Sequence, residues 1–147
     1  MGAERRELQN FTKIVEFVEH HFVRDYAANN NLTAAPEFVA SFKKAFGSES
    51  LNGEKLDELA EFAALQFAVD AHLYKTHGGR VVFDHSHPML PIEAYFNAYK
   101  AYSEKQQLVF FDKEIANTWW LGFVRPNAVE IPAGDVDFSV PWWHKLG

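Results

Sequence analysis

The sequence has no cysteine, and this absence limits its chemistry. Disulfide bonds, a thiolate nucleophile and thiolate zinc sites are all excluded, so His, Asp and Glu are the strong metal ligands that remain. The chain also lacks a run of about 18 apolar residues, which a membrane-spanning helix requires. Its first residues are typical of an amphipathic helix and unlike a signal peptide. We therefore expect no membrane insertion and a cytoplasmic location.

Basic residues are scarce relative to acidic ones. The 147 residues include 14 Lys and Arg against 20 Asp and Glu, for a formal net charge of −6. A general nucleic-acid-binding protein needs a basic face to neutralise phosphates, so this composition argues against that class. An acidic surface instead favours solubility and attraction to a basic partner. The partner that we expect is therefore another protein.

Aromatic residues are abundant, at 16% of the chain, with 14 Phe, 5 Tyr and 4 Trp. They predict a densely packed aromatic core, with an aromatic ligand pocket as the alternative. A chain of this length suits one domain, residues 1–147, which buries about 68–70% of the surface of the unfolded chain. Neither an internal repeat nor a low-complexity tract divides it.

Apolar residues repeat at steps of three and four along the first half of the chain, which predicts three helices. The first covers residues 4–28, the second follows Thr33 as its N-cap, and the third runs over residues 53–76. The third is apolar nearly all round, so it is the expected central helix. Asp70 lies in it, and a buried carboxylate must find a partner or take up a proton. Asp70 therefore either orients a histidine or bridges to a neighbouring segment.

Titratable residues, glycines and prolines crowd together between positions 74 and 92. Four of the seven histidines lie between positions 72 and 87. Gly78-Gly79 ends the third helix, residues 80–84 are expected to form a short strand, and a fourth helix begins at Pro91. The sequence Asp84-His85-Ser86-His87-Pro88 turns the chain between strand and helix. This stretch is the strongest candidate for a functional site.

Two kinds of chemistry fit this stretch. Alternate residues of an extended strand point the same way, so His85 and His87 could bind one divalent metal together, with Asp70 as a further ligand. The His-Ser-His-Pro string resembles the metal motif of JAMM-type isopeptidases, but Ala98 stands where that motif has an Asp. Without metal, Asp84 or Asp70 orienting His85 or His87 would suit general acid–base catalysis near neutral pH. The alternative is structural, with these side chains satisfying backbone groups in a strand-to-helix turn.

Tyrosines and tryptophans supply the candidate binding residues. On one face of the fourth helix, a tyrosine stripe forms either a core face or a pocket wall. Further on, short β-branched and aromatic runs at residues 108–111, 118–124, 128–131 and 136–140 predict strands. An aromatic pair near the end of the chain docks either on its own domain or on another molecule. The candidates are Tyr95, Tyr99 and Tyr102 in the stripe, Trp119 and Trp120 in the second run, and Trp142 and Trp143 in the tail.

These patterns predict an α+β fold: three N-terminal helices, a short strand, a fourth helix, and then a small antiparallel sheet packed on the long central helix. Three functions remain open. The first is an acidic, soluble protein-interaction module, such as a bacterial or phage accessory, inhibitor or immunity-type protein. The second is a small hydrolase or nuclease centred on Asp84, His85 and His87, with or without a divalent metal. The third is a small-ligand-binding domain with an aromatic pocket.

Overall fold

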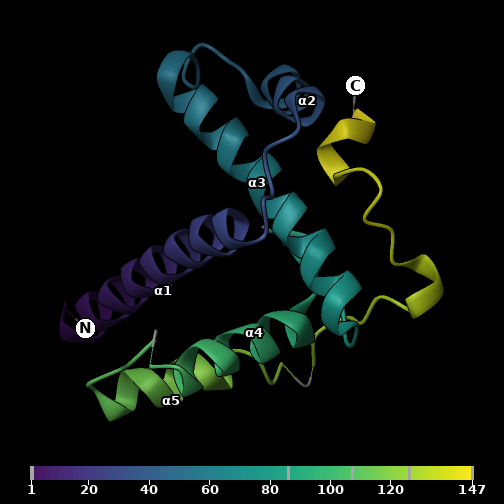
Figure 1. Ribbon diagram of the computed structural model, residues 1–147. Coiled ribbons are helices and arrows are strands. Elements are labelled where there is room, and N and C mark those ends of the chain that lie inside the picture. Colours follow the sequence, from purple (N-terminus) through teal and green to yellow (C-terminus); the bar gives the residue numbers. More distant parts are fainter. Residues whose placement is uncertain (1, 86, 107, 126, 147) are drawn as a thin grey trace.

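Helix α3 (Gly53–His77) is the axis of the computed structural model of the protein (Figure 1). It contacts α1, α2 and α4 along its length. The structure describes residues 2–85, 87–106, 108–125 and 127–146, with side chains from residue 11 onward. The buried residues of α3 are Leu56, Ala60, Ala64, Val69, Asp70 and Leu73. The prediction of a central third helix is therefore confirmed.

The two helices before α3 also form as predicted. Helix α1 covers Gly2–Asn29, and α2 covers Pro36–Phe46. The chain leaves α1 through Asn31, whose φ of 56° is in the left-handed region that Asn tolerates. Ala35 is the N-cap of α2, and Pro36 is the first helical residue. The predicted N-cap, Thr33, lies two residues earlier.

A glycine pair reverses the chain after α3. Gly78 and Gly79 have φ values of 62° and 87°, which only glycine adopts at little cost. The reversal brings the Arg80 backbone N–H to the Glu93 carboxylate at the start of the next helix, at 2.6 Å. Strand β1 can therefore run back along the end of α3.

The sheet of the described structure has two strands. Strand β1 (Val82–Asp84) pairs antiparallel with β2 (His87–Leu90), and Asp84 lies opposite His87. The segment around Glu130 runs along the other side of β1, where Ile131 N–H donates to the Val81 carbonyl at 2.8 Å. The predicted run at 128–131 thus meets the sheet through a single bridge instead of a full strand.

The small antiparallel sheet predicted after residue 107 does not form among the described residues. After β2, the described residues form helices α4 (Ile92–Glu104) and α5 (Lys113–Leu121), and then the short 3-10 turns Ala133–Asp135 and Trp142–Leu146. The Asp112 carboxylate caps α5, accepting from the backbone N–H groups of Glu114 at 2.8 Å and Ile115 at 3.2 Å. This cap and the burial of Trp119 favour a helix over the strand that aromatic residues usually prefer.

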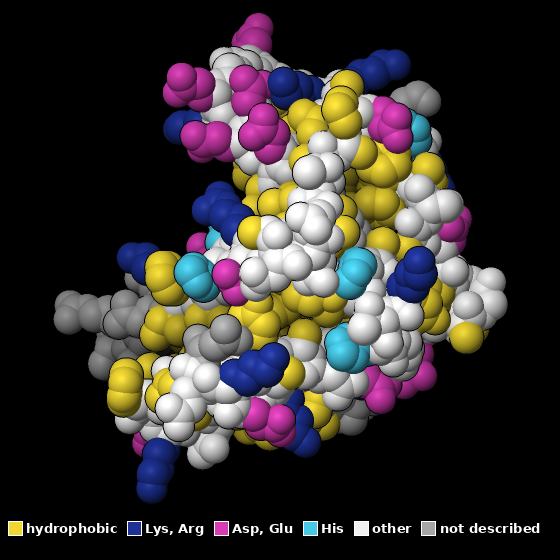
Figure 2. All heavy atoms as spheres, viewed as in Figure 1, with side chains coloured by type: hydrophobic (Ala, Val, Ile, Leu, Met, Phe, Trp, Pro, Cys, Tyr) yellow, Lys and Arg dark blue, Asp and Glu magenta, His cyan; other side chains and the backbone are white. Residues whose placement is uncertain are grey.

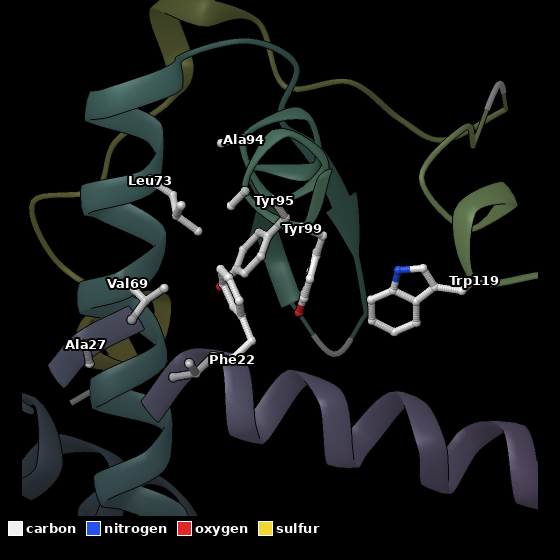
Figure 3. Packing of buried hydrophobic residues seen from close by; sticks show 10 residues of the cluster. Phe22, Ala27, Val69, Leu73, Ala94, Tyr95, Tyr99 and Trp119 are labelled. Atoms are coloured by element: carbon white, nitrogen blue, oxygen red, sulfur yellow. The ribbon is translucent and has the colours of Figure 1, made fainter. Parts of the chain in front are cut away.

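The core lies where α1, α3, α4 and α5 meet (Figure 3). Phe22 of α1 is at its centre, with ring centroids 4.5 Å from Tyr99 and 5.0 Å from Tyr102. Tyr99 in turn meets Trp119 edge-on at 5.0 Å. Offset and edge-to-face contacts of this kind are favourable beyond the area that they bury. The aromatic core that composition predicts is thus formed by four helices.

A second aromatic cluster holds the end of the chain against α2. Trp143 is 5% exposed, packs edge-on against Phe42 at 5.5 Å, and donates its indole N–H to the Phe38 carbonyl at 2.9 Å. Trp142 contacts Phe46 but stays 41% exposed. In Figure 1 the C-terminal turn accordingly lies beside α2. Of the two docking alternatives, Trp143 takes the one within its own chain.

The surface divides by residue type on the face shown in Figure 2. Acidic side chains gather over the start of α3, and apolar atoms follow the boundary between α1 and the α4–α5 layer. Within the described part of the chain, no helix combines the length and apolar character that crossing a membrane requires.

The tail contact predicts unequal effects for its two tryptophans. Trp143→Ala should lower the free energy of unfolding by about 3–5 kcal/mol, because it removes a buried ring and leaves the Phe38 carbonyl without its donor. Trp142→Ala, the matched control, should have the smaller effect because that ring is already half in water. Urea unfolding followed by circular dichroism measures both. Equal losses would contradict the tail contact.

Candidate functional site

The buried carboxylate of Asp70 joins three elements. Asp70 on α3 is 4% exposed, and both of its oxygens are hydrogen bonded. The Nε2 atom of His87, on β2, lies 2.5 Å from one oxygen, and the Tyr95 hydroxyl, on α4, donates to the other. A buried charge that loses such partners is strongly destabilising, so the three residues act as a unit. We call them the Asp70 triad.

Electrostatics in the triad favour a charged imidazole. Burial lowers the pKa of His87, whereas the Asp70 carboxylate raises it, both as a charge and as a hydrogen-bond acceptor. Glu19 and Asp84 add to the rise, so the net pKa lies above the ordinary value of 6.5. Burial and the adjacent Asp70 charge raise the pKa of Tyr95 well above 10, so its hydroxyl keeps the proton that it donates.

A cavity of about 180 Å³ opens on one side of His87. It lies between α1, α4, α5 and β2, and its wall is mostly apolar. Its apolar lining includes Val15, Val23, Leu90, Ile92 and Phe123. Its polar lining is Glu19, Gln66, His87, Tyr95, Tyr99, Thr118, Trp119 and Arg125. A concave apolar site with a few polar groups is the usual form of a small-molecule site.

Two polar atoms in this wall are buried without a partner. Tyr99 and Trp119 are 2% and 4% exposed, yet the Tyr99 hydroxyl and the Trp119 indole N–H find no hydrogen-bond partner among the described residues. Figure 3 shows the Trp119 ring extending toward that of Tyr99, with the indole nitrogen and the tyrosine hydroxyl at different edges of the pair. A buried polar group without a partner costs about 1–3 kcal/mol, so each one requires an explanation such as strain, a bound water or a functional role.

Glu19 and Arg125 are the charged residues of the wall that sequence reasoning missed. Glu19 is exposed as a residue, but it also lines the cavity. Desolvation raises the pKa of Glu19, and the positive charges of His87 and Arg125 lower it. The net pKa lies above the ordinary value of 4.5. A signal was available: Val15, Glu19 and Val23 are four residues apart, so they share one helical face.

Arg125 is held in place by backbone and side-chain contacts. Its φ of 35° is unusual for a residue with a side chain. Its Nη1 lies 2.7 Å from the Asp84 carboxylate, and its Nε donates to the Gly122 carbonyl at 3.0 Å. Asp84, a predicted catalytic residue, is therefore a partner of this arginine at the cavity.

A second cavity lies on the other side of the triad. Its volume is about 140 Å³, and Phe67, Met89, Phe138 and Trp143 form part of its wall. Gln66 and His87 line both cavities, and Asp70 lines this second one. The imidazole of His87 thus forms part of the partition between the two.

The predicted binding residues separate into different places. Tyr95, Tyr99 and Trp119 meet at the first cavity. Tyr102 instead donates to Asp25 on α1 at 2.7 Å, and burial together with this bond raises its pKa to about 12. Trp120 packs edge-on against Phe96 at 5.7 Å, outside the residues that line the cavity.

The predicted metal and catalytic residues are brought together only in part, because Asp84 and Asp70 lie near His87 but His85 does not share its strand. Strand β1 ends at Asp84 and β2 begins at His87, so His85 and His87 do not alternate along one strand as expected. His85 is exposed and meets the Phe83 ring at 5.5 Å. The described residues contain no group of three His, Asp or Glu side chains that could hold a metal ion. Asp70 and His87 are adjacent, as a hydrogen-bonded pair.

Comparisons with known proteins leave the site to be interpreted from its own geometry. The chain matches no protein-family model, and neither a curated protein nor a solved structure shows significant similarity to it.

The unpartnered Tyr99 hydroxyl predicts opposite effects for two similar substitutions. Tyr99→Phe should raise the free energy of unfolding by about 1 kcal/mol, because it removes a buried polar group that has no partner. Tyr102→Phe should lower it by about 1 kcal/mol, because it removes the bond to Asp25. Urea unfolding of the ligand-free protein compares them. A destabilised Tyr99→Phe variant would show that the hydroxyl is bonded in solution.

The His87–Asp70 bond predicts that stability falls as pH rises. Because the pKa of folded His87 lies above the unfolded value of 6.5, its stabilising contribution is complete below pH 6.5 and is lost as pH rises through the folded pKa. Unfolding free energies at about pH 6 and about pH 8 measure this loss.

His87→Gln should flatten the dependence, whereas His85→Gln, an exposed control, should not. Glu19→Gln removes the raised carboxyl pKa, whose stabilising contribution begins to be lost nearer pH 4.5 as pH rises. A wild-type stability that rises across the neutral range would refute the linkage.

Proposed function

We propose that the protein binds a small, mostly apolar carbonyl compound in the cavity between α1, α4 and α5. The observation that carries this proposal is an apolar cavity lined by Tyr99 and Trp119, whose hydroxyl and indole N–H are buried without partners and would meet a ligand after a side-chain rotation. This is the third function that the sequence leaves open, with a smaller set of residues than the sequence nominates.

The size of the cavity limits the ligand. An engineered apolar cavity of about 150 Å³ binds benzene, so a cavity of about 180 Å³ accommodates a molecule of about one ring. The apolar wall supplies the larger share of affinity through burial. A larger ligand would have to displace the side chains of α1 or α5.

The polar groups specify what the ligand carries. An indole N–H only donates, so the group that satisfies Trp119 is an acceptor. The Tyr99 hydroxyl can donate to the same kind of group. A carbonyl oxygen has two lone pairs and no charge to desolvate, so it suits this wall better than a carboxylate would beside Glu19.

The other two functions have less in their favour. The protein-interaction hypothesis would use exposed aromatic rings. Trp143 is buried against α2 and cannot contact a partner there, whereas Trp142 is partly exposed. The hydrolase or nuclease hypothesis requires His85 and His87 to act together, but they do not lie on one strand. Both stay predictions that the contacts of the described residues do not favour over ligand binding.

Two nearly isosteric probes test the proposal. Cyclohexanone and methylenecyclohexane differ in having C=O or C=CH₂, and saturation-transfer NMR measures the affinity of each for the protein. Cyclohexanone should bind about fivefold more tightly, which corresponds to one net hydrogen bond of about 1 kcal/mol. Absence of binding by both probes would refute the proposal.

The variant Trp119→Phe should remove the preference for the ketone while retaining affinity for the hydrocarbon. Trp120→Phe is the matched control, because that indole lies outside the cavity lining and should leave the preference unchanged. A preference for the ketone that survives in Trp119→Phe would show that the carbonyl is not held by this indole.

A further inference from the structure

We infer that the second cavity, on the other side of the Asp70 triad from the first, binds a methylated ammonium cation. Its volume is about 140 Å³, and aromatic rings from α2, α3 and the C-terminal segment line it together with an exposed aspartate, Asp137. The rings are those of Phe42, Phe67, Phe138, Trp142 and Trp143. This site is separate from the carbonyl-binding cavity and goes beyond the proposed function.

Packing does not seal the rings of this cavity. Phe42, Phe67 and Phe138 are half-buried, and Trp142 is 41% exposed. Burial of the remaining apolar surface would stabilise the fold, so rings that served packing alone would close the space between them. The open ring surface around the cavity is therefore available to a ligand.

The rings meet at steep angles, as the walls of a box do. Trp143 lies at 85° to Phe42 and at 74° to Phe67, with ring centroids 5.5 and 6.3 Å apart. Trp142 lies at 84° to Trp143, at 5.9 Å. Rings that meet at such angles form corners, and the inner side of a corner is bounded by ring faces. A cation is attracted to these faces, and cages of aromatic rings recognise methylated ammonium groups.

Asp137 supplies a negative charge for such a cation. Asp70 also lines the cavity, but His87 and Tyr95 already satisfy its two oxygens. Asp137 accepts hydrogen bonds from the hydroxyl of Ser139 at 2.6 Å and from its backbone N–H at 2.9 Å. These bonds lower the pKa of Asp137, so its carboxylate is ionised at neutral pH.

The size and dryness of the cavity favour a quaternary ammonium over a primary one. An apolar cavity of about 150 Å³ holds benzene, and a trimethylammonium group has a similar bulk. A quaternary ammonium has no N–H group, so its entry among apolar rings leaves no donor unsatisfied. Its methyl groups contact the ring faces directly.

Lys145 gives the site a property that an apolar cavity would lack. Lys145 lines the same cavity, and its charge acts on Asp137. It is exposed, and a lysine ammonium is strongly hydrated, so it is not the cation that fills the space between the rings. Lys145 instead opposes the binding of a second cation. Its removal should strengthen that binding.

Choline and 3,3-dimethylbutan-1-ol test the inference, because they share one shape and differ in having N⁺ or C at the branched centre. NMR titration of the full chain measures both dissociation constants. Choline should bind about tenfold more tightly, which corresponds to about 1.4 kcal/mol of attraction to the rings and the carboxylate. Equal affinities, or binding of neither probe, would overturn the inference and leave the proposed function in place.

The variant Trp142→Leu should weaken choline binding about threefold, the size of one cation–π contact at a partly exposed site. Trp120→Leu is the matched control, because that ring lies outside the lining of the second cavity. If choline affinity is unchanged in a folded Trp142→Leu variant, choline is held by diffuse attraction to the acidic surface, which would also overturn the inference.

Two exposed charges test the site without disturbing the core. Asp137→Asn should weaken choline binding about threefold, and its amide oxygen still accepts from Ser139. Asp135→Asn, which is exposed and outside the lining, is the control. Lys145→Gln should tighten choline binding about twofold. Neither substitution should alter the affinity of the neutral alcohol, and choline affinity that responds to neither would refute the site.

Discussion

The fold depends on satisfying one buried carboxylate. Asp70 lies in the middle of the central helix, where an unpaired charge would oppose folding by several kcal/mol. Its two oxygens are satisfied only when β2 brings His87 and α4 brings Tyr95 to α3. The glycine turn after α3, the strand reversal and the start of α4 are thus held to one geometry. The same constraint places the His87 side chain at the edge of a cavity.

Aromatic packing explains both the strength of the core and the presence of the cavity. Large, flat rings on α1, α4 and α5 meet at offset and edge-on angles, and such packing fills space around the rings unevenly. Tyr99 and Trp119 line part of the space that remains, and their polar atoms are buried. In a core built only for stability, Phe would serve at both positions without that cost. These polar atoms therefore add no stability to the core of the ligand-free protein.

Sequence reasoning succeeds for helices with a clear repeat and fails where two preferences compete. Helices α1 and α3 follow from apolar steps of three and four, and the burial of Asp70 follows from its apolar neighbours. Residues 118–124 were predicted as a strand because tryptophan, phenylalanine and valine favour strands. The Asp112 cap and the i, i+4 spacing of Ile115 and Trp119 favour a helix instead. Burial of Trp119 against α4 further stabilises the helix relative to the strand.

By itself, the sequence determined what depends on neighbours along the chain. It specified the mostly helical N-terminal half, the glycine reversal after α3, the aromatic core and the need of Asp70 for a partner. Only the tertiary structure decided which histidine is that partner. His85 and His87 are two residues apart and chemically identical. In the fold, His85 is exposed to solvent, whereas His87 on β2 contacts Asp70 of α3. The cavity, too, belongs to the tertiary structure, because its wall joins residues from α1, α4 and α5 that no local pattern relates.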